Sequence, residues 1–426
     1  MTLPTQAPVF APFYAYPSKE ALCDAFVKMP VDGLRTPAFI VDRAVFAQNC
    51  ALMHKGVLQG WKASFRAHVK THKTVEGTKM TLDSTEGTTH AVLVSTVAEA
   101  WGIINGGLVA DGTVKDLLYG LPIALTKLDD LSAVKAELEK HGAVLRLMID
   151  HEDQVKGLEE YMKLKGVKGW TGFIKVDSGN KRAGLTPTAP SLPSLIKAII
   201  ASPAIDIYGF YCHAGHSYSS TSLEVASAKL KEELDAANAA CTLALSLSST
   251  PPAVPYVLSV GSTPTAHAAS LNPQSFDLKG KLEIHAGNYP FLDLQQLATT
   301  LIDNERIAAT VLTTVISSYP DRDGGEGMCD AGALAMSKDR GPIPGFGDVV
   351  TPGWENWRLG RVSQEHGVLT RVEGKQGKEL VVGSMLQVVG QHSCLTSACF
   401  PWYYIVDSNE GDGKTVVDVW VPWRAW

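Results

Sequence analysis

Apolar and polar positions follow two different periods between residue 34 and about residue 298. Short apolar segments have the length and the β-branched content of strands, and most segments between them repeat their apolar residues with the period of a helix. Strands that alternate with helices form parallel βαβ units, and about eight such units over roughly 250 residues are the size of a (β/α)8 barrel. We predict its strands at 64–70, 90–96, 116–122, 144–150, 172–178, 205–213, 256–262 and 282–289. A ninth apolar segment, 36–42, is in excess, and we expect it to pair with a second domain.

The helical period stops after about residue 298. Segments such as 308–320, 379–390 and 415–423 are rich in β-forming residues and are separated by glycine-rich breaks. The predicted fold class is therefore α/β, a (β/α)8 TIM barrel followed by an all-β C-terminal domain. We place the barrel at 33–298 and the β-domain at 299–426. Residues 1–32, rich in proline and aromatic residues, form an N-terminal arm that we expect to pack with the β-domain.

Composition excludes several classes of protein for this chain of 426 residues. A net charge of -6 and a pI of about 6.1 do not suit a nucleic-acid binder, whose phosphate contacts need a basic surface. No apolar run approaches the length of a membrane span, and the N-terminus lacks the pattern of a secretory signal. The seven cysteines are odd in number and scattered, which is typical of reduced thiols in a cytoplasmic enzyme.

The first predicted barrel strand carries Arg66, His68 and Lys70 on one face, because side chains two residues apart in a strand share a face. One interpretation is an edge strand with a solvated basic face. The other is a strand whose cationic face points at an anionic cofactor. In a barrel the active site lies at the carboxyl ends of the strands, where Lys70 is placed. On this interpretation Arg66 and His68 are inward-facing supports beneath Lys70 that meet the cofactor.

Other predicted strands also end in polar and titratable residues. These residues include Arg182, His213, His216, Tyr218, Gly261, Ser262, Thr263, His285 and Tyr289. The VGSTPT motif allows close approach of the backbone and offers hydroxyl and N–H groups to a phosphate. A lysine at a strand end, a phosphate cradle and several histidines together suggest pyridoxal phosphate (PLP), which needs an amine, phosphate donors and a partner for its ring nitrogen.

A second candidate site is the pair His392 and Cys394 in the segment VVGQHSC. If this segment is a strand, the imidazole and the thiolate project to the same side and could bind one zinc ion. Two protein ligands leave positions open for water or substrate, which suits a catalytic metal and not a closed structural site. The pattern H-x-C alone is common and also occurs by chance.

Eight motifs in this order resemble the D-serine dehydratase / D-threonine aldolase family of PLP enzymes with an alanine-racemase-like barrel. They are RAHVKTHK, VDSGNKRAGL, CHAGHSY, GSTPT, LEIHAGNY, DAGALAMSKD, SQEHG and QHSC, and the resemblance covers roughly residues 34–407. It implies that Lys70 is the Schiff-base lysine and that His392 and Cys394 are zinc ligands. It places Arg182 on the cofactor side, and Gly261, Ser262 and Thr263 at the phosphate. His285 stands where alanine racemases carry an arginine that faces the ring nitrogen.

The resemblance implies loss of water from a D-3-hydroxy amino acid, with D-serine as the first choice, giving pyruvate and ammonia. Lys70 would remove the α-proton and zinc would bind the β-hydroxyl. Retro-aldol cleavage of D-threonine, with His213 or His216 as base, is the alternative. Dehydration of 3-hydroxyaspartate is another, but it needs a further cation that the sequence does not place. If Lys70 did not hold the cofactor, Lys73 is the other candidate.

Two interpretations from other classes remain open at this stage. A non-catalytic PLP protein would share the barrel and the lysine but not the β-domain with its H-x-C pair. A barrel that binds no PLP is the other. The resemblance further implies a homodimer in which the β-domain of one chain completes the site of another.

Overall fold

The computed structural model describes residues 3–5, 15–272, 276–322 and 324–426, which form two compact units. The first, the barrel unit, contains Ala51–Gly287 and Trp423–Trp426, and the second, the sheet unit, contains Tyr16–Cys50 and Asn288–Pro422. The boundary expected at 32/33 lies at 50/51, because the ninth apolar segment and the residues around it belong to the sheet unit, and the boundary expected at 298/299 lies at 287/288. Of the expected arm, residues 1–2 and 6–14 lie outside the described residues.

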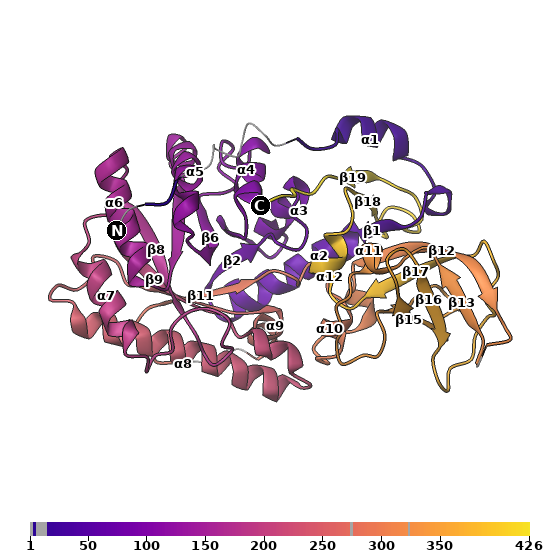
Figure 1. Ribbon diagram of the computed structural model, residues 1–426. Coiled ribbons are helices and arrows are strands. Elements are labelled where there is room, and N and C mark those ends of the chain that lie inside the picture. Colours follow the sequence, from indigo (N-terminus) through magenta and orange to yellow (C-terminus); the bar gives the residue numbers. More distant parts are fainter. Residues whose placement is uncertain (1–2, 6–14, 273–275, 323) are drawn as a thin grey trace. The chain divides into compact units, whose positions relative to one another are not determined.

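The barrel unit confirms the predicted closed barrel of eight parallel strands (Figure 1). In chain order these are β2 (Ser64–His68), β5 (Ala91–Val94), β6 (Asp116–Pro122), β7 (Val144–Ile149), β8 (Trp170–Val176), β9 (Ile205–Cys212), β10 (Val257–Val260) and β11 (Lys281–Ala286). The last strand pairs in parallel with the first, with Ile284 opposite Phe65. The interior below the strand ends is filled by apolar side chains, among them Leu118, Met148 and Phe173.

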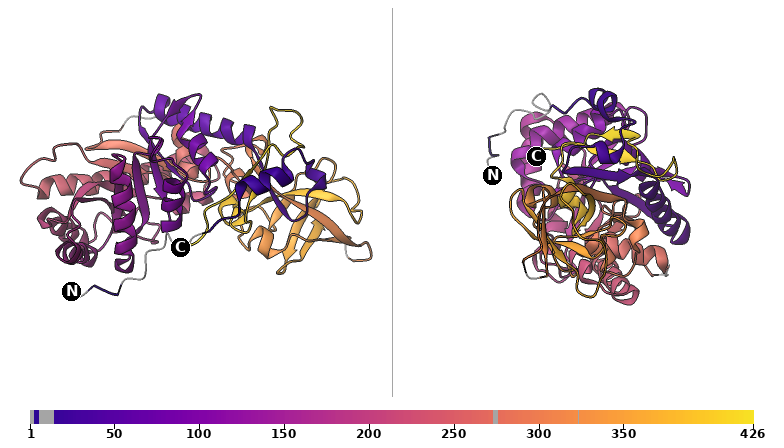
Figure 2. Two further views of the ribbon diagram at one scale, coloured as in Figure 1. Left: turned by 90° about the horizontal axis from the view of Figure 1, so that it is seen from above. Right: turned by 90° about the vertical axis from the view of Figure 1, so that its right-hand side faces the viewer.

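Helices lie outside the barrel strands and connect them (Figure 2). They are α3 (Val75–Leu82), α4 (Val97–Asn105), α5 (Leu128–Lys140), α6 (Glu152–Lys165), α7 (Ser191–Ala201), α8 (Leu223–Leu247) and α9 (Thr263–Leu271). Helix α2 (Arg43–His54) and the π-helical turn Lys55–Gly60 lead into β2, and β3 (Asp83–Ser84) with β4 (Gly87–Thr88) form a small hairpin. No helix among the described residues is long and apolar enough to cross a membrane.

The sheet unit is built on one nine-stranded sheet with the order β13-β16-β15-β14-β17-β12-β1-β18-β19. Its strands are β1 (Ala38–Asp42), β12 (Ala309–Tyr319), β13 (Glu326–Cys329), β14 (Gly347–Val349), β15 (Trp357–Val362), β16 (Gly367–Arg371), β17 (Met385–Gly390), β18 (Tyr403–Val406) and β19 (Asp418–Trp420). Strand β13 also pairs with β12, so six of the strands close into a ring. Three short helices accompany them, α10 (Leu294–Leu297), α11 (Ala333–Met336) and α12 (Ser393–Ser397).

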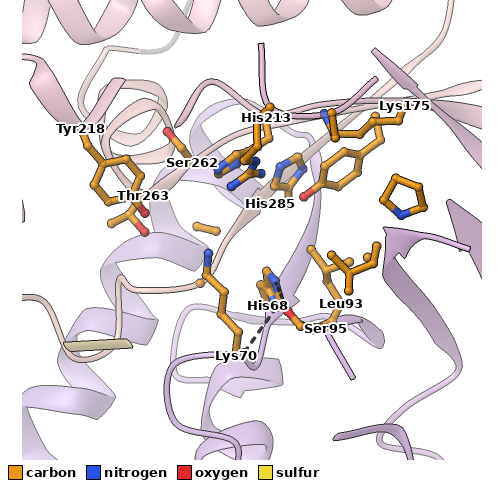
Figure 3. Close-up of a pocket in the computed structure, with 18 residues that line it drawn as sticks. His68, Lys70, Leu93, Ser95, Lys175, His213, Tyr218, Ser262, Thr263 and His285 are labelled. Atoms are coloured by element: carbon orange, nitrogen blue, oxygen red, sulfur yellow. Dashed lines mark hydrogen bonds between the residues drawn. The ribbon is translucent and has the colours of Figure 1, made fainter. Parts of the chain in front are cut away.

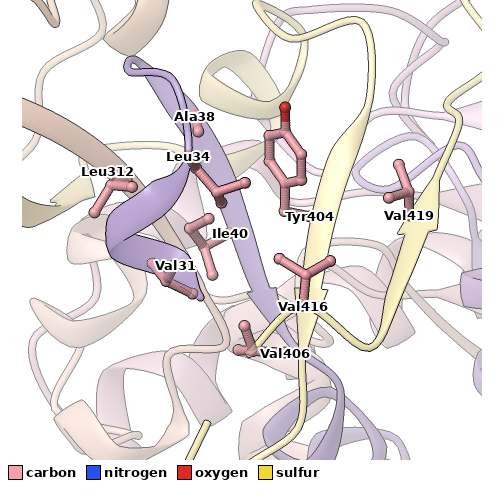
Figure 4. Close-up of a cluster of buried hydrophobic side chains, with 9 residues drawn as sticks. All are labelled: Val31, Leu34, Ala38, Ile40, Leu312, Tyr404, Val406, Val416 and Val419. Carbon is pink, nitrogen blue, oxygen red and sulfur yellow. The ribbon is translucent and has the colours of Figure 1, made fainter. Parts of the chain in front are cut away.

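Strand β1 joins the two parts of this sheet. It runs antiparallel to β12 and parallel to β18, with Ala38 opposite Leu312 and Ile40 opposite Tyr404. One face of β1 contributes to an apolar cluster formed by Val31, Leu34, Ala38, Ile40, Leu312, Tyr404, Val406, Val416 and Val419 (Figure 4). Helix α1 (Lys19–Phe26) packs against β19, and its Leu22 and Phe26 cover the same cluster. The described part of the arm after residue 15 therefore lies with the sheet.

A buried ionic cluster occupies the amino-terminal half of the barrel. The guanidinium of Arg66 is fully buried and donates from Nε to Glu283 Oε1 and from Nη1 to Asp116 Oδ1, at 2.8 Å each. Arg146 donates to the other oxygen of Asp116 at 3.0 Å. The cluster thus ties the first barrel strand, β2, to the last, β11, and to β6 and β7. The expectation that Arg66 meets the cofactor is wrong, because its charge is used by these carboxylates.

We predict that Arg66→Met lowers the free energy of unfolding by about 3–5 kcal/mol, because it leaves the carboxylate of Glu283 buried without a counter-charge. Denaturant unfolding followed by far-UV circular dichroism measures this. Lys231→Met is the matched control, because its partner Asp235 and Lys231 itself are each 60% exposed. The control should change stability by less than about 1 kcal/mol. Equal effects of the two substitutions would contradict the role of Arg66.

Candidate cofactor pocket and metal-binding pair

A cavity of about 310 Å³ lies at the carboxyl ends of the barrel strands. Its lining includes eight of the residues predicted from the sequence, namely His68, Lys70, Arg182, His213, Tyr218, Ser262, Thr263 and His285. Figure 3 shows the side chain of Lys70 extending into this pocket, with its amine on the side of Thr263 and His285. These residues come from four separate strand ends and the loop after β8, and only closure of the barrel brings them together.

The two candidate lysines after β2 have different surroundings. Lys70 lines the pocket, whereas Nζ of Lys73 lies 3.0 Å from Oε1 of the buried Glu99, on α4. Lys73 has a φ of 54°, and its carbonyl accepts a hydrogen bond from the backbone N–H of Trp423 at 2.7 Å. Thr71 donates to the carbonyl of Gly287 at 2.9 Å. The loop that follows Lys70 is therefore held at three points, and the pocket receives Lys70 and not Lys73.

The VGSTPT motif forms the start of helix α9. Ser262 caps this helix by accepting a hydrogen bond from the N–H of Thr265, and its hydroxyl lies 2.6 Å from that of Ser217. Gly261, directly before it, has a φ of 144°, and a Cβ there would lie 2.1 Å from the carbonyl oxygen of His285. Only glycine allows this approach, although Gly261 itself does not line the pocket. Hydroxyl groups and the positive end of a helix dipole therefore face the cavity, which is a phosphate-binding arrangement.

Three imidazoles surround the pocket, and burial lowers the pKa of each well below the usual value. For His68 the charge of Lys70 adds to burial, and for His213 the charges of Arg182 and Lys70 do so. For His285 the added charges are those of Lys175 and Arg66. All three rings are therefore uncharged at neutral pH, and the positive charge of the pocket resides on its amines and guanidinium.

Each of these rings has a defined hydrogen-bond partner. Nδ1 of His68 donates to the carbonyl of Leu93 at 2.9 Å, and Nδ1 of His213 donates to the carbonyl of Gly261 at 2.7 Å. Nδ1 of His285 lies 3.0 Å from the hydroxyl of Ser259, and its ring stacks on Tyr211 with centroids 4.0 Å apart. Nε2 of His285 is buried and has no hydrogen-bond partner among the described residues. This atom is available to the ring nitrogen of a bound cofactor.

Lys175, on β8, is a second amine in the pocket that the sequence reasoning missed, and unlike Lys70 it is buried. Its Nζ donates to the carbonyl of Val176 at 3.0 Å and lies 5.3 Å from the ring centre of Tyr211. Burial lowers its pKa. The signal was present in the sequence, because Lys175 stands two positions before Asp177 in a strand whose alternation places it on the inner face.

Two predicted residues lie elsewhere. Tyr289 is fully buried in the sheet unit, where it contacts the thiol of Cys50, and it does not line the pocket. His216 is directed to Glu232 on α8, with Nε2 3.1 Å from the carboxylate, and is not a lining residue either. Of the two histidines considered as a base, the pocket contains His213.

The expectation that His392 and Cys394 lie on a strand is wrong. Strand β17 ends at Gly390, and His392 is the N-cap of the short helix α12. The two side chains nevertheless form a hydrogen bond, because His392 is still extended, with φ −143° and ψ 103°, before the chain turns into the helix.

Two carboxylates that the sequence reasoning did not assign fix this pair. Asp339, in the DAGALAMSKD motif, lies 2.9 Å from Nδ1 of His392, and Gln295 donates to the same carboxylate at 3.1 Å. The buried Asp293 accepts from the N–H of Ser393 at 2.8 Å. An imidazole whose Nδ1–H is held by a carboxylate presents Nε2 as a ligand, as in many zinc sites.

The chemistry of these donors fits zinc, which binds imidazole and thiolate in proteins. Within the residues that the structure describes, no group of three or more His, Cys, Asp or Glu side chains is arranged to hold a metal ion. The candidate site in this chain therefore consists of two ligands, and further positions would remain for water or substrate.

The eight-stranded barrel, its strand-end lysine and the separate sheet unit of the same chain define an alanine-racemase-like barrel enzyme. Residues 41–278 match the family model "Alanine racemase, N-terminal domain", and residues 308–406 match "Putative serine dehydratase domain". A D-serine dehydratase of Schizosaccharomyces pombe is 42% identical over 97% of each chain. One of Saccharomyces cerevisiae is 36% identical over 93% of this chain and 97% of its own. The chain belongs to the D-serine dehydratase family and is a lyase.

Solved structures agree with this assignment. D-threo-3-hydroxyaspartate dehydratase from Delftia sp. HT23 superposes with a TM-score of 0.77 and 28% identity, covering 93% of this chain and 100% of its own. D-threonine aldolase from Filomicrobium marinum, at 19% identity and a TM-score of 0.71, covers 93% of this chain and 97% of its own and shares the fold.

Behind the phosphate cradle, the structure shows one further titratable group that the sequence did not indicate. Glu233, on α8, is fully buried, and its Oε1 accepts a hydrogen bond from the N–H of Ala214. Burial is the largest effect on this carboxyl and raises its pKa to about 7, although the bond to Ala214, weaker contributions from Thr265 and Gly261, and the charge of Lys175 oppose the shift.

This carboxyl predicts a pH-dependent stability. The carboxyl of Glu233 keeps a proton in the folded protein that it loses in the unfolded chain above pH ~4.5. Its contribution to the free energy of unfolding is therefore complete below that pH and is lost as the pH rises through about 7. Relative to Glu233→Gln, we expect the free energy of unfolding of the native protein to fall by about 3 kcal/mol between pH 4.5 and 8. Denaturant unfolding at each pH measures this. Asp235→Asn, an exposed change on the same helix, should follow the native protein, and parallel curves for Glu233→Gln would contradict the assignment.

Proposed function

We propose that this protein removes water from a D-3-hydroxy amino acid with PLP and zinc as cofactors, and that D-serine, giving pyruvate and ammonia, is its substrate. The observation that carries the proposal is that one chain combines Lys70, in a pocket that faces the start of α9, with the His392–Cys394 pair. The names of the relatives with 36–42% identity support the choice of D-serine.

The residues of the pocket suit each part of PLP. The amine of Lys70 would attach to the cofactor, and Ser262, Thr263 and the start of α9 would hold its phosphate. Nε2 of His285 would meet the ring nitrogen, and because this imidazole is uncharged it can accept a hydrogen bond, which an arginine cannot. When bound, PLP supplies an electron-withdrawing ring that stabilises negative charge at the α-carbon of a substrate.

In the reaction, Nζ of Lys70 would take the α-proton. It is the amine next to the phosphate cradle. His68 and His213 lie near it and are uncharged, so they do not compete with Lys70 as acids. Lys175 and Arg182 keep this part of the pocket positive, which favours the carboxylate of an amino acid.

His392 and Cys394 would bind zinc, with Asp339 fixing the orientation of the imidazole. When bound, zinc supplies Lewis acidity that reduces the negative charge on a departing hydroxide. Structures of D-threo-3-hydroxyaspartate dehydratase include a metal-free variant in which a cysteine is replaced by alanine, and another in which a histidine is replaced by alanine. Those two residues stand two positions apart, as His392 and Cys394 do, which supports the pair as the metal ligands.

We predict that Lys70→Ala abolishes the absorbance of the cofactor imine and the release of pyruvate from D-serine. Lys73→Ala is the matched control, because its amine pairs with Glu99 and not with the pocket. The control should keep the imine absorbance in a visible spectrum of the purified protein. Retention of the imine in Lys70→Ala, with its loss in Lys73→Ala, would refute the assignment of Lys70.

Removal of zinc by a chelator should abolish pyruvate release from D-serine, and added zinc should restore it, because hydroxide is a poor leaving group without a Lewis acid. Cys394→Ala should bind no zinc and lose at least about a hundredfold in activity. Cys399→Ala, a half-buried thiol five positions away, should keep both. Full activity of chelated protein, with metal content measured by atomic absorption, would refute a zinc-dependent elimination.

A second candidate function, dehydration of 3-hydroxyaspartate, is favoured by Lys175. This substrate has a second carboxylate, and Lys175 is the additional cation in the pocket that such a substrate needs. Separate assays of D-serine, D-threonine and D-3-hydroxyaspartate at equal concentrations distinguish the possible reactions. The products to measure are pyruvate, glycine and oxaloacetate, respectively. Glycine from D-threonine as the main product would instead support retro-aldol cleavage with His213 as base.

We also propose that the protein is a homodimer, as the family resemblance implies. Analytical ultracentrifugation at micromolar concentration measures this directly. A single species with the mass of one chain, 45.7 kDa, would refute it.

A further inference from the structure

The long helix α8 carries a carboxyl group toward the back of the phosphate cradle. Glu233 lies near the middle of this helix, which packs against α9, β9 and β10. Its side chain is fully buried, and no Lys, Arg or His within the described part of the chain lies in ion-pairing distance of it. A buried carboxyl without an ion pair destabilises the fold unless hydrogen bonds offset the cost of its burial.

Those hydrogen bonds connect two loops. The N–H of Ala214 in the loop after β9 donates to Oε1 of Glu233. The backbone of Gly261 and the hydroxyl of Thr265, on both sides of Ser262 after β10, contribute more weakly to the same carboxyl. The two loops are also joined directly, by His213 to the carbonyl of Gly261 and by Ser217 to Ser262.

The residues in contact with Glu233 lie within two positions of residues that line the pocket. Ala214 follows His213, Gly261 precedes Ser262, and Thr265 lies two positions after Thr263. A small displacement of either loop would therefore move a hydroxyl, an N–H group or an imidazole at the cofactor pocket. Binding groups displaced by a fraction of an ångström lose much of their contribution to affinity.

We propose that Glu233 is a positioning residue for the phosphate of the cofactor, because it fixes the loop His213–Ala214 and the loop Gly261–Thr265 at the separation that the phosphate requires. The inference rests on the proposed function in one respect, namely that the bound anion is the phosphate of PLP. Glu233 does not touch the pocket itself, so it acts through the residues that line it.

The test compares PLP with pyridoxal, which has the same ring and aldehyde but no phosphate. Both are titrated into cofactor-free native protein, Glu233→Ala, Glu233→Gln and the control Asp235→Asn, and binding is followed by the absorbance of the imine. We expect Glu233→Ala to bind PLP about tenfold or more weakly, with pyridoxal affinity changed by less than about twofold. Glu233→Gln, whose amide oxygen can still accept the N–H of Ala214, and Asp235→Asn should both bind PLP within about threefold of the native protein.

Glu233→Asp covers the case in which Glu233→Ala does not fold. It keeps the carboxyl but withdraws it by one methylene, so a selective loss of PLP affinity relative to pyridoxal is again expected. Equal loss of PLP and pyridoxal affinity, or unchanged PLP affinity, in the folded variants would overturn the positioning role. Native protein that binds neither compound would overturn the proposed function itself, which distinguishes the two failures.

Discussion

The barrel depends on a guanidinium that has no access to water. Arg66 on β2 can be buried only because Glu283 on β11 and Asp116 on β6 neutralise it, and Glu283 belongs to the strand that closes the barrel. The basic residues of β2 and of the turn after it therefore have two different roles. Arg66 holds the lower half of the barrel together, and the residues above it, His68 and Lys70, reach the pocket. The same closure fixes the strand ends, so the positions of the site residues follow from it.

Three cations then set the charge of the pocket, of which Lys175 is buried. Lys70, Lys175 and Arg182 lie among three imidazoles, and together with burial they keep those imidazoles uncharged. Positive charge is thereby restricted to a few fixed atoms, while the rings serve as hydrogen-bonding and stacking groups. An anionic cofactor and an anionic substrate fit such a site without any carboxylate at its surface. The carboxyl that does lie nearby, that of Glu233, is placed behind the cradle, and its raised pKa reduces its negative charge at neutral pH.

Local pattern predicted most of the barrel and the strand-end residues. Eight apolar segments and the rule that sites lie at carboxyl ends were enough to place Lys70, Ser262 and His285 in one pocket. The conformation of His392 and Cys394 was not predicted, because a helix start after β17 depends on a backbone contact with Asp293, a hundred positions earlier. Glu233 was missed for a related reason. It lies in an ordinary amphipathic helix, and its importance comes only from the loops that tertiary packing brings against it. Tyr289 follows a barrel strand in sequence, yet the chain has already entered the sheet unit there.

Strand β1 lies inside the sheet, between β12 and β18, but the residues of the barrel unit separate it in sequence from both of these neighbours. Ala38 pairs with Leu312 and Ile40 with Tyr404, so its partners are synthesised only after the whole stretch Ala51–Gly287. The barrel can begin to fold from one continuous stretch of the chain. The sheet cannot form until nearly the last residues have been synthesised, and it then has to bring together segments that are distant in sequence. We therefore expect an ordered assembly in which the barrel forms first, and in which a newly made chain carries β1 with open hydrogen-bonding edges until synthesis is almost complete. Because β1 is made early and its neighbours in the sheet are made late, the growing chain is prone to aggregate through the edges of β1, a risk that the folded protein does not have.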